Sequence, residues 1–528
     1  MKDLLTSAPI GGDLTVPRYH LVDLVVSRPE HQVEGNPFDL DLSATFRGPH
    51  DRVITVPGFY DLDLGFVVRF SPEAVGNWSY TVTSTDATLN GRGGSLTCVA
   101  DGLPSWHGPL KVDQAHPHHF LWGDDTRCFL MGYEANWLMA VDQEPSDLTR
   151  VNELLDDLVT YGFNMVTVNA YAYVHPSRWD VTWQESGDPI FVTPTVAPWV
   201  GSNAEPDYAQ MNAAYFAHCD RIMIEMLRRG LLAHLMIHVY NKGIPWPEMC
   251  SADDNRYWRY VVARYQAFAN IILDPGKETF NRPATYVQDR IRFIESLDGY
   301  QRITTVHDPC HMKPWHDWPY HRRNWDPERE VADGMVDFKS DQIHLFWYED
   351  AVGNYRAAER PYVNIEYGYE TGMREIPTNN PLRVQHWREV LRRSWLVTMG
   401  GGYINYYYLN TAWTVFLHRP IPPGYAAHLA YRKFWESTSY WLLAPDNAPV
   451  GNAELVYCRC NPGQEYVVFD EAGRGFDLDA TGDGVYNARW FNPVGDEYVD
   501  AGRVSAGKET FRSPFGRGCW AVLHLKRQ

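Results

Sequence analysis

The sequence predicts an α/β fold, a (β/α)8 barrel flanked by an N-terminal and a C-terminal antiparallel β-sandwich. Short β-rich segments closed by turn residues fill both ends of the chain, and strands alternate with helices between them. The chain has 528 residues, which is too many for a single hydrophobic core. We therefore expect three domains, at residues 1–103, 104–444 and 445–528.

Both ends of the chain read as small all-β domains. The first 103 residues contain the strand-like segments "SATFRGP", "RVITVPGFYD", "GFVVRFSP" and "NWSYTVTSTD", each closed by Gly, Pro, Asn or Asp. Turns at this short spacing are typical of an antiparallel sandwich. The same texture returns after residue 445 in "AELVYCRC", "EYVVFDEAG", "GVYNARWFNP" and "CWAVLHLK", which predicts the second sandwich.

The middle of the chain alternates strands with helices. The predicted strands are 128–132, 164–170, 231–239, 270–274, 302–307, 338–344, 362–366 and 402–408. The first helix is typical: Ser146 is its expected N-cap, Gly162 closes it, and apolar residues recur between them at helical spacing. No Gly-rich phosphate motif follows any strand, so the barrel is favoured over a doubly wound open sheet.

Charge and cysteine content exclude several classes of function. The net charge of −19 argues against nucleic acid or an anionic membrane as a partner. No apolar run approaches the ~20 residues of a membrane span, and the N-terminus lacks a signal-peptide core, so we expect a cytoplasmic location. The eight cysteines form no CxxC pair, and Cys458 and Cys460 are a weak metal signal, better explained as reduced structural thiols. We expect no metal or organic cofactor, and the run "HPHHF" from His116 is expected to be an exposed linker.

In a (β/α)8 barrel, residues just past the C-terminal ends of the strands converge on one face and carry the active site. Here two predicted strands end in acids, "NIILDPGKE" at Glu278 and "YVNIEYGYE" at Glu366. The other strand-end residues are mostly amides, imidazoles and aromatics: Glu134, Asn136, Trp137, Asn169, His238, Lys277, His307, His344, Tyr408 and Trp413. Cleavage of a glycosidic bond requires two carboxyl groups, and the remaining side chains suit the binding of sugar hydroxyls and rings. The high aromatic content, 14%, fits either sugar platforms or large β-sandwich interiors.

Motifs over most of the chain resemble the apiosidase-like multidomain glycoside hydrolases with an N-terminal β-sandwich, within the clan of retaining (β/α)8-barrel glycosidases. These are "GFYDLDLGFVVRFSPEAVGNWSYTV", "NIILDPGKE", "LDGYQRITTVHDP", "NIEYGYE" and "YNARWFNPVGDE". The resemblance implies a retaining mechanism in which Glu366 is the nucleophile and Glu278 the acid/base. Two departures stand out. Lys277 occupies the position at which the clan prefers Asn. The acid at the end of the fourth strand is Glu278, whereas the pattern that apiosidases resemble has Asp at this position. The substrate therefore need not be apiose.

Several alternatives remain open at this point. Glu134 is either a third active-site acid or part of a structural salt bridge. Asp274 is expected to cap the end of its strand and not to act in catalysis. Glu370 is an alternative to Glu366 as the catalytic acid of the seventh strand. An ammonium close to Glu278 would favour its ionised form and weaken a proton donor. We therefore expect Lys277 to point away from Glu278, toward substrate or toward Glu134 or Asp274. A non-catalytic carbohydrate-binding protein with a degenerate barrel is the alternative function. The sugar, its anomeric configuration, the linkage and assembly as a homo-oligomer stay open.

Overall fold

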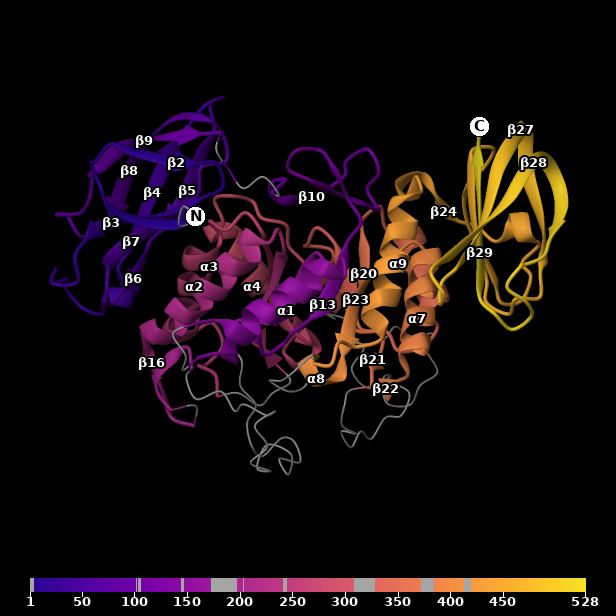
Figure 1. The fold of residues 1–528 in the computed structure, drawn as a ribbon. Helices are drawn as coiled ribbons and strands as arrows, with labels where there is room; N and C mark the ends of the chain where they lie inside the picture. Colours follow the sequence, from indigo (N-terminus) through magenta and orange to yellow (C-terminus); the bar gives the residue numbers. More distant parts are fainter. Residues whose placement is uncertain are drawn as a thin grey trace.

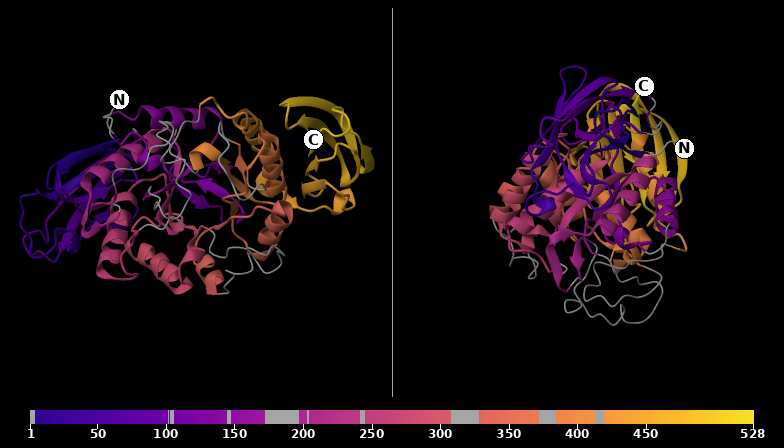
Figure 2. Two further views of the ribbon diagram at one scale, coloured as in Figure 1. Left: turned by 90° about the horizontal axis from the view of Figure 1, so that it is seen from below. Right: turned by 90° about the vertical axis from the view of Figure 1, so that its left-hand side faces the viewer.

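The computed structural model describes residues 4–100, 102, 106–143, 147–171, 197–202, 204–240, 245–307, 328–371, 384–412 and 419–528. Two β regions lie at opposite ends of a central region of strands and helices (Figures 1 and 2). In the described part of the chain, no helix is long and apolar enough to cross a membrane.

The N-terminal region consists of two sheets. One has the order β1-β3-β7-β6, from strands Leu5–Pro9, Leu21–Ser27, Gly65–Phe70 and Phe59–Asp61. The other has the order β2-β9-β8-β4-β5, from strands Leu14–Pro17, Gly93–Val99, Gly76–Ser84, Leu42–Arg47 and Val53–Pro57. Phe46 of the second sheet stacks on Phe70 of the first, with ring centroids 3.7 Å apart. Aromatic packing therefore joins the two sheets.

Parallel strands form a closed ring in the central region. The path β18-β17-β14-β13-β23-β20-β19 consists of Ile271–Lys277, Leu232–Val239, Met165–Asn169, Met131–Glu134, Tyr403–Tyr408, Tyr362–Asn364 and Lys339–Asp341. Parallel bridges from Leu273 to Thr304 and from His307 to Ser340 join the two ends of this path. Each of the eight predicted strand segments contributes to this strand ring, although the fifth contributes only these bridges.

Helices follow the ring strands along the chain and cover their outer side (Figure 1). They are α1 Thr149–Thr160, α2 Ala213–Arg228, α3 Ala252–Tyr265, α4 Ala284–Leu297, α5 Glu328–Asp333, α6 Trp347–Ala357, α7 Trp387–Met399, α8 Leu409–Ala412 and α9 Gly424–Glu436. Short strands add to this region: β10 Leu110–Val112, β11 Phe120–Trp122, β12 Arg127–Cys128, β15 Trp199–Gly201, β16 Pro206–Met211, β21 Tyr369–Glu370 and β22 Val384–Gln385. Within the described residues, 3-10 turns lie at 37–39, 138–140, 279–281, 440–442 and 448–450.

Helix α1 begins later than the sequence suggests. Its expected N-cap, Ser146, lies outside the described residues, and the helix starts at Thr149. The carboxylate of Asp142 accepts hydrogen bonds from the backbone N–H groups of Arg150 (2.8 Å) and Val151 (3.0 Å). These are donors of a first helical turn, so Asp142 caps the helix from outside it. The helix ends at Thr160, and Gly162, which the sequence predicts to close it, follows two residues later with φ +82°.

The expectation of an exposed "HPHHF" linker is wrong for two of its histidines. His119 is buried and its ring is hydrogen-bonded to the Tyr403 hydroxyl on β23 at 2.7 Å. His118 stacks on Tyr355, with ring centroids 3.8 Å apart. The segment therefore packs against the central region, which the polar letters of the sequence do not reveal.

The C-terminal region pairs as one antiparallel sheet of order β24-β25-β26-β29-β27-β28. Its strands are Ala444–Pro445, Val456–Asn461, Glu465–Asp470, Ala521–Arg527, Phe476–Asn492 and Glu497–Phe511. Tyr486 and Trp490 belong to its buried cluster, as do Cys458 and Cys460, whose thiols are free. An arrangement of two packed sheets in this region stays a prediction.

A buried ionic network attaches the N-terminal sheets to the helices. Arg69 on β7 donates to both carboxylate oxygens of Asp23 (2.7 and 2.9 Å) and to Asp220 on α2 (2.8 Å). It also donates to the backbone carbonyl of Arg264 on α3 (3.1 Å), whose own guanidinium donates to Asp220 (2.8 Å). Burial raises the pKa of Asp220, but the two guanidinium groups outweigh it and lower that pKa. Asp220 therefore remains ionised beneath the N-terminal sheets.

We predict that Arg69→Met lowers the free energy of unfolding by about 3–5 kcal/mol, because it leaves buried carboxylates without their cation. The control is Arg52→Met, which removes a half-exposed ion pair with Glu73 and should cost about 1 kcal/mol or less. Urea denaturation of both variants measures the difference. Equal losses in the two variants would show that the buried network of Arg69 contributes no more to the free energy of unfolding than the half-exposed ion pair of Arg52.

Candidate active site

A single ammonium group on one strand contacts side chains from three others at the C-terminal end of the ring. Lys277, the last residue of β18, places its Nζ 3.4 Å from Glu134 Oε1 at the end of β13. The same Nζ lies 3.4 Å from Glu366 Oε2, just after β20, and 3.2 Å from the Tyr407 hydroxyl on β23. All four side chains are buried. Two carboxylates that would otherwise repel each other therefore share one positive charge.

Glu366 receives donors on both of its carboxylate oxygens. The Tyr369 hydroxyl donates to Oε1, and the Tyr407 hydroxyl donates to Oε2 at 3.1 Å. His344 Nε2 is 3.6 Å from Oε1, and the backbone N–H of Glu366 donates to Asn364 Oδ1 at 3.3 Å. Hydrogen bonds to the charged form favour ionisation. This surrounding suits a carboxylate that acts as a base or nucleophile.

Glu134 is completely enclosed and held from the other side by Asn405. The Asn405 Nδ2 donates to Glu134 Oε2 at 2.8 Å and to the Ile365 carbonyl at 3.1 Å. A side chain at Gly132 would place its Cβ 2.3 Å from Asn405 Oδ1, so this glycine makes room for the amide. Burial raises the pKa of Glu134, which Lys277 opposes and Glu366 reinforces. Glu134 therefore forms the salt bridge that was one of its two sequence alternatives, and its role as a third active-site acid stays a prediction.

Lys277 remains protonated in this cluster. Burial lowers its pKa, but the charges of Glu134, Glu366 and Glu278 together raise it above the ordinary value. As expected, the ammonium pairs with Glu134 and is not ion-paired with Glu278 among the described contacts. The contact with Glu366 was not anticipated.

Glu278 directly follows β18 and is half-buried. Its backbone is left-handed, with φ +55° and ψ +57°, and it begins a 3-10 turn at Thr279. Non-glycine residues in this conformation are strained and cluster at functional sites. Gly276, two residues earlier, has φ +148°, and a Cβ there would lie 2.1 Å from the His238 carbonyl. The bend at the end of "DPGKE" therefore depends on this glycine and turns Lys277 and Glu278 out of the regular strand.

Asp274, expected as a strand-end cap, lies within β18 and accepts a hydrogen bond from the backbone of that strand. One of its oxygens accepts the Gly276 N–H at 2.8 Å, and the other is 2.7 Å from His234 Nε2. Both side chains are fully buried, and burial raises the pKa of Asp274. His234 was not among the predicted site residues, because it lies within a strand instead of at its end.

The other predicted residues lie around this cluster. His238 packs its ring against Trp246 and Tyr240, with centroids 3.7 and 3.9 Å away, and burial lowers its pKa well below the ordinary value. The His307 Nδ1 is 3.2 Å from Met236 Sδ, and burial lowers the pKa of His307 as well. Asn136, Trp137 and Asn169 are buried just past β13 and at the end of β14. Trp413 lies outside the described residues.

The structure adds a tyrosine on β23 that the sequence interpretation did not select. Tyr407, not Tyr408, contacts Lys277 and Glu366. Side chains alternate along a strand, so Asn405 and Tyr407 share the face that meets the acids. Tyr408 is buried at the end of the same strand. The alternation of side chains along the strand was the signal that could have selected Tyr407, whereas the strand-end criterion selected Tyr408, the last residue of the strand.

Glu370, the alternative to Glu366 in the sequence analysis, makes a different set of hydrogen bonds. It accepts hydrogen bonds from the Tyr406 hydroxyl and from the backbone N–H of Gly424, the first residue of α9, at 3.3 Å. Burial raises the pKa of Glu370 to about 7, and these two donors oppose the rise. Glu370 therefore caps a helix on the outer side of the strands, away from the Lys277 ammonium.

A model of the apiosidase-like catalytic domain matches residues 115–441, more than half of the chain. A second model, of a domain of unknown function (DUF5060), matches residues 15–85. Together with the buried acids at the strand ends, the first match defines a glycosidase. The chain belongs to the apiosidase-like family. A comparison with curated proteins gives no match.

Two crystal structures from Bacteroides vulgatus ATCC 8482 share the fold. One, described as a candidate glycoside hydrolase, is 19% identical with a TM-score of 0.76, and the match covers 98% of this chain and 100% of that one. The other, a glycoside hydrolase family 5 protein, is 15% identical with a TM-score of 0.58, covering 80% and 94%. The first match extends the similarity of fold to all three regions of the chain.

We predict that Glu370→Gln changes the pH dependence of stability. A carboxyl whose pKa rises on folding to about 7 stabilises the fold below its unfolded pKa and loses that contribution as pH rises to about 7. Gln has no proton to lose, so the stability of the variant relative to wild type should increase by about 1–3 kcal/mol between pH 4 and pH 8. Thermal unfolding at the two pH values measures this change. A difference that does not vary with pH would show that folding does not raise the pKa of Glu370.

Proposed function

We propose that the protein is a retaining glycoside hydrolase that acts by double displacement, with Glu366 as the nucleophile and Glu278 as the acid/base. The catalytic domain would be a (β/α)8 barrel at residues 104–444, between β-sandwiches at 1–103 and 445–528. The observation that carries the proposal is the group of donors on Glu366, which are Lys277, Tyr369 and Tyr407. These donors favour the ionised form of this carboxylate and fix it at the end of a ring strand.

In the first step, one oxygen of Glu366 attacks the anomeric carbon while the bond to the leaving oxygen breaks. Glu278 donates its proton to that oxygen, which leaves as an alcohol. In the second step, water attacks the same carbon, Glu278 takes a proton from the water, and the ester to Glu366 breaks. Two displacements at one carbon retain its configuration. The Tyr407 hydroxyl and Lys277 contact Oε2, so Oε1, with Tyr369, is the oxygen we assign to the attack.

Lys277 bears on the class of substrate. Its ammonium already has two carboxylate partners, so the trio of Lys277, Glu134 and Glu366 carries a formal charge of −1. A sugar carboxylate placed beside this trio would meet net repulsion. We therefore favour a neutral pentose or hexose in the cleaved subsite, and apiose, a neutral pentose, is one candidate that the family name suggests. Its proposed binding residues are Asn136, Trp137, Asn169, His238, His307, His344, Tyr408 and Trp413.

The stereochemical outcome tests the mechanism. A panel of aryl glycosides, furanosides included, first identifies a cleaved sugar, and proton NMR then follows the anomer released before mutarotation. We expect the retained anomer. Glu278→Gln and Glu366→Gln should each lower kcat/KM at least about 10²-fold. Release of the inverted anomer would remove Glu366 as a nucleophile, and sugar binding without turnover would favour a non-catalytic binding protein.

We predict that Lys277→Met moves the acidic limb of the pH–rate profile of kcat/KM upward by about 1–3 pH units. Removing an opposite charge at close range disfavours the ionised carboxylate, and this limb follows ionisation of the nucleophile. The matched control is Lys339→Met, because Lys339 is also buried and pairs with Asp333 and Asp341 at 3.2 and 3.4 Å. The control should lose stability while keeping its acidic limb in place. An unmoved limb in Lys277→Met would show that the ammonium does not act on the nucleophile.

A further inference from the structure

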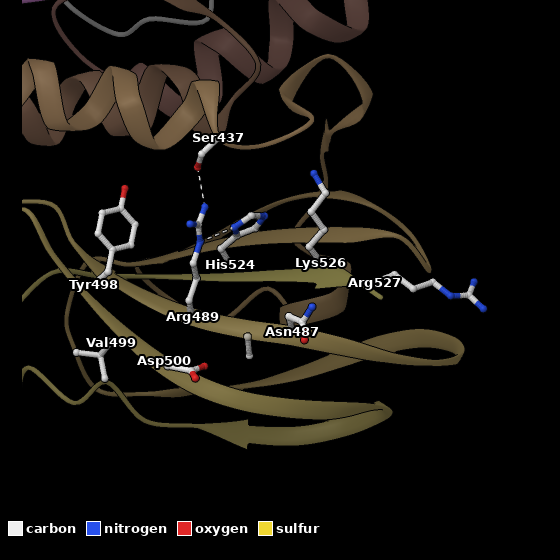
Figure 3. A pocket seen from close by; sticks show the side chains of 10 residues that line it. Ser437, Asn487, Arg489, Tyr498, Val499, Asp500, His524, Lys526 and Arg527 are labelled. Atoms are coloured by element: carbon white, nitrogen blue, oxygen red, sulfur yellow. Dashed lines mark hydrogen bonds between the residues drawn. The ribbon is translucent and has the colours of Figure 1, made fainter.

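A well-defined pocket lies on the C-terminal sheet, beside the end of α9. Its volume is about 660 Å³, within the range of small-ligand sites. Side chains of β27, β28 and β29 form its floor, and Ser437, which follows α9, forms part of its wall (Figure 3). The pocket therefore lies where the C-terminal sheet meets the central region, away from the acids of the ring.

Positive charge predominates in this pocket. Arg489, Lys526 and Arg527 line it, and Asp500 is the one acid among the lining residues. The formal charge of the lining is thus +2, on a chain whose net charge is −19. A cationic pocket on an acidic protein favours small anionic ligands.

Arg489 is held in place by a chain of hydrogen bonds. Its Nη2 donates to Ser437 Oγ at 2.6 Å, and its Nε donates to His524 Nδ1 at 3.1 Å. The buried His524 ring is fixed in turn by Glu465, whose Oε1 is 2.7 Å from Nε2. Burial lowers the pKa of His524, so the neutral ring donates from Nε2 to Glu465 and accepts from Arg489 at Nδ1. The guanidinium is therefore pre-positioned for a ligand.

An exposed aromatic ring stands beside this guanidinium. Tyr498 is 43% exposed, and its ring lies 4.7 Å from that of Phe491, its partner across the strands. The centre of the Arg489 guanidinium is 5.3 Å from the Tyr498 ring centroid. A fixed ring offers a flat apolar face for a sugar, and a guanidinium matches the two oxygens of a carboxylate. On the other side of Arg489, Lys526 donates to Ser439 Oγ at 3.0 Å and supplies a second cation.

We propose that this pocket is a second carbohydrate site, which binds an acidic oligosaccharide made of uronic acid units. Tyr498 contacts the face of one sugar ring, and Arg489 and Lys526 bind sugar carboxylates. The site needs no catalysis at the strand ring, so it does not depend on the mechanism proposed above.

Calorimetric titration of the full chain with trigalacturonate tests this site. We expect saturable binding that weakens as salt is added, because the contacts are ionic. Arg489→Gln and Tyr498→Ala should each weaken binding at least tenfold, whereas Tyr498→Phe, which keeps the ring, should bind like wild type. Lys508→Gln is the matched control, since Lys508 is an exposed cation that pairs with Asp477 on the same hairpin outside the pocket.

Cellotriose and inorganic sulfate separate the two parts of the proposal. Neither the neutral sugar nor the bare anion should bind as tightly as trigalacturonate. The proposal is overturned if trigalacturonate does not bind, if either probe binds equally well, or if Arg489→Gln and Tyr498→Ala bind like wild type.

Discussion

The ammonium of Lys277 is the interaction on which the candidate active site depends. Glu134 and Glu366 are 0% and 2% exposed, and both lie 3.4 Å from Lys277 Nζ. Two carboxylates enclosed together would repel each other and lose their hydration, so without the cation at least one would take up a proton. Along the sequence, Lys277 lies 143 residues after Glu134 and 89 residues before Glu366. Closure of the strand ring is what brings these charges together.

The residues around this cluster follow from strand geometry. Asn405 and Tyr407 lie two positions apart on β23, so both face the acids. Asn405 donates to Glu134, and Tyr407 donates to Glu366. Gly132 leaves the volume that Asn405 occupies, and Gly276 allows the backbone to bend before Lys277 and Glu278. Glycines on β13 and β18 therefore shape the site as much as its charged groups do.

The sequence predicted the strands well and the contacts between side chains only in part. Apolar runs closed by turn residues located every segment of the ring, because burial on both faces leaves a local pattern. The fifth segment pairs through only two bridges, which no local pattern distinguishes from a full strand. The contacts of Tyr407 and Tyr369 with Glu366 depend on packing across the ring, and the contact of Glu370 depends on α9. Strand-end position alone carries no information about these contacts. The expected roles of Glu278 and Glu366 came from the resemblance of short motifs to the apiosidase-like glycoside hydrolases. The spacing of the two acids along the sequence did not supply these roles.

The residue that becomes covalently glycosylated can be identified directly. A 2-deoxy-2-fluoro derivative of the cleaved sugar, with a good leaving group, would slow the second displacement and allow the glycosyl-enzyme to accumulate. Mass spectrometry of the digested protein then locates the ester. We predict an adduct on Glu366 that is absent from Glu366→Gln. An adduct on Glu134 or Glu278, or turnover of the sugar with no adduct at all, would contradict a nucleophilic Glu366 held by Lys277.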